Sequence, residues 1–191
     1  MSNKKMNMLT KSALFAALIY AATLTGAIAP IGGGAYIHIG DAMIYLAVVL
    51  LPTPYAVASA AVGAAFADLT LGSLIYVIPT IIVKALVVLT AKLLMRASKH
   101  ILVQDILICL SGIVTIAGYY VSEVVLLIIS GSQLEAALTT AAVDSVPFNA
   151  IQAAVSGLLF LIAGEAVRNI VNKKKNRTDE SDVSQSDDMQ D

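Results

Sequence analysis

The sequence predicts an all-α integral membrane protein, a bundle of about six transmembrane helices. Of its residues 58% are hydrophobic and 13% charged, and the mean hydropathy is +0.84. A soluble domain needs more polar residues than this to cover its surface. Apolar runs recur at roughly the 20 residues that a helix needs to cross a bilayer, and the basic residues gather between runs. We therefore expect a multi-pass protein of the cell membrane.

The apolar runs predict spans at residues 9–29, 39–51, 54–71, 74–95, 104–130 and 146–169. The second span is short, because it begins at His38 or Asp41 and ends where Pro52 and Pro54 interrupt the helix. The first span ends in Ala27-Ile28-Ala29, which has the form of a signal-peptide cleavage site. However, this run is longer than the usual signal core of about 7–15 residues, so we expect it to remain as a span.

The basic residues predict the orientation of the chain. Eleven of the twelve Lys and Arg residues fall before the first span, after the fourth or after the sixth. All of these places lie on one side for six spans, so the positive-inside rule puts both termini in the cytoplasm. We expect residues 1–172 to form the transmembrane substrate-binding domain. Residues 173–191 are polar and acidic, and we expect a disordered cytoplasmic tail.

Several function classes find no support in the sequence. The basic residues are accounted for by topology, which argues against a nucleic-acid partner. Cys109 is the only cysteine, so an intrachain disulfide is impossible. No nucleophile with a base partner and no metal-binding motif is present, so we expect no enzyme, catalytic residue, cofactor or metal site. His38 is better explained as a cap or headgroup contact than as a metal ligand.

Polar side chains inside the predicted spans point to a binding pocket. Lys84 lies ten residues into the fourth span, about 15 Å deep, where a charge costs roughly 2.5–3.5 kcal/mol on insertion scales. It could instead form a structural ion pair with Asp68 or Glu123. The candidate substrate-binding residues all map to the outer half of the membrane: Tyr36, His38, Asp41, Asp68, Lys84, Tyr119, Glu123, Asn149 and Gln152.

Other residues are candidates for contacts with helices or lipid. Ala13, Ala17 and Ala21 follow one another at i, i+4 in the first span and form a strip that lets another helix approach closely. That helix could belong to a partner or to the same subunit. Four tyrosines could be interfacial anchors: Tyr20, Tyr45, Tyr55 and Tyr76.

Taken together, these features resemble the substrate-binding (S) components of energy-coupling factor (ECF) vitamin transporters. The resemblance covers residues 9–170 and rests on the size, the six spans, the alanine strip and the stretch from Gly32 to Gly40-Asp41 before the short span. That stretch is similar to the glycine-rich lid of the riboflavin-type branch. Ala67-Asp68 and Lys84 are also similar in position.

The resemblance implies a mechanism. Such proteins bind a vitamin or precursor near the outer face of the bacterial plasma membrane. They then associate with a transmembrane coupling subunit and two ATPase subunits, and topple in the lipid to release the solute inward. On this analogy, the alanine strip contacts the coupling subunit and the 30–38 loop gates the pocket. The substrate stays open among riboflavin, a pyridoxine-like compound and a pyrimidine-type precursor. The absence of Trp argues against a fused ring stacked on both faces.

Two other classes of function stay open. A stand-alone secondary carrier would use Lys84, Glu123 and Asp68 as a proton or ion relay. A non-transporting membrane scaffold would use the small-residue helix faces for assembly. Polar groups gathered at one depth favour a carrier-like pocket over the scaffold.

Overall fold

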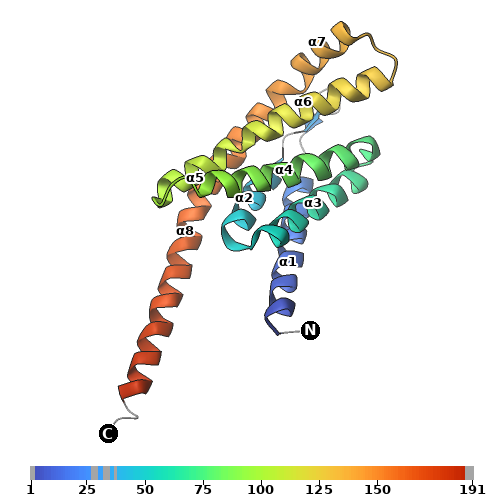
Figure 1. The fold of residues 1–191 in the computed structure, drawn as a ribbon. Helices are drawn as coiled ribbons and strands as arrows, with labels where there is room; N and C mark the ends of the chain where they lie inside the picture. The colour runs from blue at the N-terminus through green and yellow to red at the C-terminus, as the bar shows by residue number, and fades with distance from the viewer. Residues whose placement is uncertain (1–2, 27–29, 32–34, 37, 188–191) are drawn as a thin grey trace.

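The computed structural model describes residues 3–26, 30–31, 35–36 and 38–187, with side chains described for 3–25 and 38–166. Within these ranges the regular secondary structure is helical apart from one β-hairpin (Figure 1). Its elements are α1 (Asn3–Gly26), β1 (Pro30–Ile31), β2 (Ala35–Tyr36), α2 (Gly40–Leu50), α3 (Thr53–Thr70), η1 (Leu74–Tyr76), α4 (Val77–Met95), α5 (Ile101–Leu110), α6 (Gly112–Ile129), α7 (Leu134–Asp144) and α8 (Val146–Asp187).

The all-α membrane fold is confirmed. The predicted spans correspond to α1, α2, α3, η1 with α4, α5 with α6, and α8. In the described part of the chain, four segments are long and apolar enough to cross a bilayer by themselves: Asn3–Thr25, Leu74–Met95, Ile101–Ile129 and Leu134–Ala166. The start of α1 and the end of α8 lie toward the same side of the molecule (Figure 1), as an even number of crossings requires. Which side faces the cytoplasm remains a prediction.

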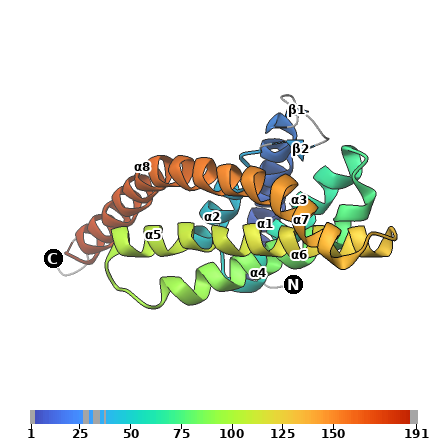
Figure 2. The ribbon, with the colours of Figure 1, turned by 90° about the horizontal axis from the view of Figure 1, so that it is seen from above.

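The short helix α2 is central to the bundle. Eight of its eleven residues are buried, and it packs on α1, α3, α4 and α8. Viewed from above, it lies between α1 and α8 (Figure 2). Because α2 is surrounded by protein, its length need not match the hydrocarbon thickness. We call the end of the bundle where α2 and α8 begin the hairpin end, since β1 and β2 lead into α2 there.

The segment 131–145, between the predicted fifth and sixth spans, contains the helix α7. Its alanine-rich sequence favours a helix, and Ala137 and Ala141 pack against Val124 of α6 in a second small apolar cluster. Glu135 and Asp144 of this helix are exposed. The helix α8 runs to Asp187 and so takes in most of the segment 173–191, whose far end, 188–191, lies outside the described residues. The division into domain and tail stays a prediction.

Small residues bring α1 very close to its neighbours. Ser12 and Ser59 share a hydrogen bond between their Oγ atoms at 2.9 Å, and Ser59 also donates to the Ser12 carbonyl at 2.9 Å. A Cβ on Gly63 of α3 would lie 2.5 Å from the Ala16 carbonyl oxygen. A Cβ on Gly40 of α2 would lie 2.2 Å from Thr23 Oγ1. Close backbone approach of this kind drives helix association in membranes.

Gly63→Ala should lower the stability of the protein. The added methyl group would overlap backbone of α1, and such overpacking typically costs about 1–3 kcal/mol. Thermal unfolding of the detergent-solubilised protein measures the effect. Gly164→Ala is the matched control, because the added Cβ meets only the Phe160 ring, at 3.4 Å. Equal melting temperatures for the two variants would contradict the tight α1–α3 contact.

Candidate functional site

Asp41 lies at the centre of a buried polar cluster at the hairpin end of α2. Its Oδ1 accepts a hydrogen bond from Lys84 Nζ of α4 at 2.6 Å, and the two residues form an ion pair. Its Oδ2 accepts from Gln152 Nε2 of α8 at 3.2 Å and, more weakly, from Thr115 Oγ1 of α6 at 3.4 Å. Side chains from four helices therefore meet at one carboxylate.

The ion pair is sealed from solvent and lipid, with Asp41 0% and Lys84 1% exposed. Lys84 Nζ also lies 5.1 Å from the centre of the Tyr119 ring, a cation–π contact. The Tyr119 hydroxyl shares a 3.0 Å hydrogen bond with Thr80 Oγ1. Removing one partner of a buried ion pair lowers the stability of the fold, because the other charge is left uncompensated. The pair therefore gives Lys84 a stable place deep in the bundle.

His38 lies beside the cluster, before α2 begins. Its Nδ1 accepts a hydrogen bond from the Gly40 backbone N–H at 3.2 Å, and its side chain is buried. Burial, together with the positive charge of Lys84, lowers the pKa of His38 to about 4. The imidazole is therefore neutral at physiological pH, the state in which Nδ1 can accept this hydrogen bond.

A second polar contact joins η1 to α6. The Tyr76 hydroxyl donates a hydrogen bond to Glu123 Oε2, and both side chains are half-buried. We expected Lys84 to pair, if at all, with Asp68 or Glu123, and this was wrong. Glu123 lies two turns along α6 from Thr115, so it faces Tyr76 instead, and α2 supplies the acid that meets Lys84.

The structure brings together four of the nine predicted binding residues: Asp41, Lys84, Tyr119 and Gln152. His38 adjoins them, and the buried Asp68 lies within electrostatic reach of Lys84 and Tyr119.

Asn149 does not join the cluster, because its side-chain amide donates to the carbonyl and hydroxyl of Ser145 one turn back. Tyr36 belongs to β2, and its side chain lies outside the described residues, as do residues 32–34 and 37 of the predicted lid.

Two hydroxyl residues of the cluster, Thr80 and Thr115, were not predicted from the sequence. Each lies four positions before a residue that was predicted: Thr80 before Lys84, and Thr115 before Tyr119. The i, i+4 spacing puts each pair on one helix face. That spacing could have identified both threonines. Tyr45 is fully buried, so it is not an interfacial anchor.

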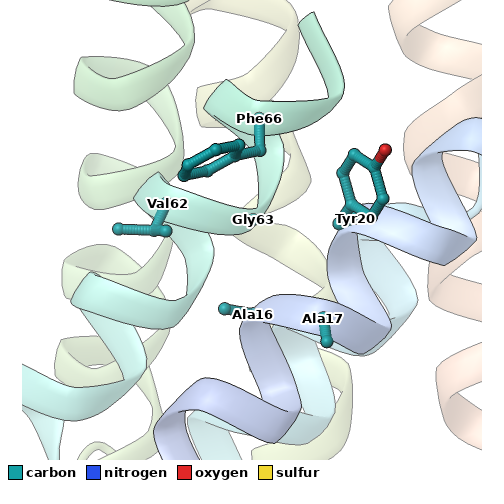
Figure 3. Close-up of a pocket in the computed structure, with 6 residues that line it drawn as sticks. All are labelled: Ala16, Ala17, Tyr20, Val62, Gly63 and Phe66. Atoms are coloured by element: carbon teal, nitrogen blue, oxygen red, sulfur yellow. The ribbon is translucent and has the colours of Figure 1, made fainter. Parts of the chain in front are cut away.

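The alanine strip lies on an exposed face of α1, and Ala17 borders the packing with α3. Ala13, Ala17 and Ala21 are all exposed, whereas Ser12 and Ile19 are buried. Beside the strip, α1 and α3 leave a shallow apolar groove of about 210 Å³ (Figure 3). Its lining residues are Ala16, Ala17, Tyr20, Val62, Gly63 and Phe66. All three alanines of the strip are therefore left exposed by the described part of the chain.

Comparison with known proteins gives a consistent family. Residues 3–169 match the family described as ECF-type riboflavin transporter, S component. Among solved structures, the fold is similar to that of the S component of a bacterial ECF transporter, with a TM-score of 0.63 and 18% sequence identity. The alignment covers 87% of this chain and 98% of that one, and at this identity it supports the fold alone. No curated protein sequence matches significantly.

Lys84→Met should destabilise the protein strongly, by about 3–5 kcal/mol, because it leaves Asp41 buried without its counter-charge. Adding Asp41→Asn should recover much of that loss, since the neutral pair no longer holds an uncompensated charge. Thermal unfolding in detergent measures both. Lys92→Met is the control, because Lys92 Nζ donates to the Leu51 carbonyl. The effects of Lys92→Met and Asp41→Asn on stability should simply add. If the effects of Lys84→Met and Asp41→Asn also add, the two residues are not energetically coupled and the prediction is wrong.

Proposed function

The chain belongs to the family of ECF-type riboflavin transporter S components, and from this we propose that it captures riboflavin at the outer face of the membrane. As a member of this family it is the substrate-binding subunit of an ECF transporter, an integral membrane protein and not an enzyme. The observation that supports the site is the convergence of four helices on Asp41 near the hairpin end.

The groups near Asp41 fit the chemistry of riboflavin. The ring edge of riboflavin offers an imide N–H and carbonyl oxygens, and the sugar-like chain of the vitamin carries several hydroxyls. The cluster offers an amide at Gln152, hydroxyls at Thr80 and Thr115, and an aromatic face at Tyr119. Small-molecule sites in proteins orient a ligand with a few placed polar groups among apolar walls.

The charge balance of the ion pair favours a neutral ligand. Lys84 is already neutralised by Asp41 at 2.6 Å, so the pair needs no counter-ion from the solute. A charged ligand would have to displace one partner and leave the other buried alone, which is costly. Riboflavin carries no charge at neutral pH. We infer that it binds on the hairpin-end side of the pair and exchanges hydrogen bonds with Gln152 and Thr115.

We propose further that the exposed strip of Ala13, Ala17 and Ala21 contacts the transmembrane coupling subunit, which works with two ATPase subunits. A strip of small side chains lets a second helix approach closely. The adjoining groove of about 210 Å³ has room for a bulky apolar side chain of that helix (Figure 3). The relay expected of a secondary carrier is less well supported, because Glu123 hydrogen-bonds Tyr76 and Lys84 pairs with Asp41.

Riboflavin should stabilise the purified, detergent-solubilised protein without ATP or partner subunits. Linkage predicts about 2.7 kcal/mol at one hundred times the dissociation constant, growing with concentration. Flavin fluorescence and thermal unfolding give independent readouts. Gln152→Ala should weaken binding about tenfold, by loss of one buried hydrogen bond. Gln104→Ala is the control, since the Gln104 amide donates to the Ser98 carbonyl instead of to Asp41. Stabilisation by a pyridoxine-like or pyrimidine compound instead would correct the substrate, and no stabilisation by any vitamin would refute vitamin capture.

Ala17→Leu should abolish riboflavin uptake in cells while leaving binding by the isolated subunit unchanged, because the added bulk blocks a helix that approaches the strip. Uptake of labelled riboflavin and co-purification with the coupling and ATPase subunits measure the effect. Ala117→Leu on the exposed face of α6 is the control for an added side chain in lipid. Normal uptake by the Ala17 variant would place the coupling contact elsewhere.

A further inference from the structure

A second polar layer lies one helical turn from the Asp41 cluster, further from the hairpin end. Asp41 and Tyr45 are four apart on α2, Gln152 and Ser156 four apart on α8, and Ser111 precedes Thr115 by four. Residues spaced by four share a helix face. The helices α2 and α8 run away from the hairpin end, and α6 runs toward it. Tyr45, Ser156 and Ser111 therefore all lie further from the hairpin end than Asp41, Gln152 and Thr115. We call Tyr45, Ser111 and Ser156 the inner polar layer.

The inner polar layer is fully buried, yet two of its hydroxyls are not satisfied. Tyr45, Ser111 and Ser156 are each 0% exposed. The Tyr45 hydroxyl and Ser156 Oγ have no hydrogen-bond partner within the described part of the chain. Ser111 Oγ donates to the Ile108 carbonyl at 2.6 Å, which leaves its lone pairs available. Gly112, the residue after Ser111, lies beside the Tyr45 hydroxyl.

Packing keeps the Tyr45 hydroxyl in this layer. Its ring meets Phe160 edge to face, with centroids 5.7 Å apart at 71°, and Phe160 lies one turn beyond Ser156 on α8. A Cβ at position 112 would lie 3.0 Å from the Tyr45 hydroxyl, so the glycine there keeps a side chain away from the oxygen. The hydroxyl therefore faces the junction of α2, α5, α6 and α8 and cannot reach lipid headgroups or bulk water.

We propose that this junction holds one bound water molecule between the hydroxyls of Tyr45 and Ser156, with Ser111 as a third partner. Buried waters typically make about three hydrogen bonds to polar groups that are otherwise unsatisfied. Tyr45 and Ser156 can each donate or accept, and a lone pair of Ser111 can accept a proton of the water. The water links the three helices that contribute Asp41, Thr115 and Gln152. This inference does not depend on which solute the protein carries.

A double-mutant cycle of Tyr45→Phe and Ser156→Ala tests the water by thermal unfolding in detergent. With a shared water, each substitution lowers the melting temperature by about 2–4 °C, and the double variant loses less than the sum. In a dry layer, each change only removes an unsatisfied hydroxyl. The melting temperature then stays the same or rises, and the effects add, which would overturn the proposal.

Ser59→Ala combined with Tyr45→Phe is the matched control cycle. Ser59 is also a buried serine, but it makes direct hydrogen bonds to Ser12 and Tyr55, so its effect should add to that of Tyr45→Phe. A structure at a resolution that shows ordered solvent gives a second test that needs no variant. Density for a water at about 2.7–3.0 Å from both hydroxyls supports the proposal, and a junction with no such density overturns it.

Discussion

The constraint on which the rest of this structure depends is that a lysine buried in a membrane protein must have its charge neutralised. Lys84 meets Asp41 at 2.6 Å, and this requires α2 to begin within reach of the middle of α4. A carboxylate that is bonded on one oxygen still has lone pairs on the other, and Gln152 and Thr115 use them. The ion pair therefore sets the relative positions of α2, α4, α6 and α8, which together surround the candidate site.

Much of the fold follows from the sequence because membrane helices are set by local properties. Apolar runs predicted the long spans, and Pro52 with Pro54 predicted the break between α2 and α3. The helix α7 was missed because an alanine-rich segment between two spans is long enough for only about three turns and has no apolar run of membrane length. The β-hairpin was missed because its strands have two residues each.

The membership of the site could be predicted better than its contacts. Lys84, Asp41, Tyr119 and Gln152 were identified because polar groups are costly in a bilayer. Their pairing was not, since Asp41 and Lys84 are 43 residues apart in the chain and Asp41 and Gln152 are 111 apart. Such contacts depend on how helices rotate and pack, which side-chain type and periodicity do not determine. The same limit applies to Glu123, whose partner Tyr76 lies 47 residues away.

The contact between Thr23 and Gly40 gives α1 a direct connection to the site. Gly40 precedes Asp41, and the backbone there touches the Thr23 hydroxyl too closely for any Cβ to fit, while the exposed Ala21 lies two positions earlier on the same helix. A protein docked on the alanine strip would therefore be about one helix diameter, roughly 10–12 Å, from the charged centre. If docking displaces α1 against Gly40, docking and solute occupancy become thermodynamically linked, and each must change the affinity for the other by the same factor.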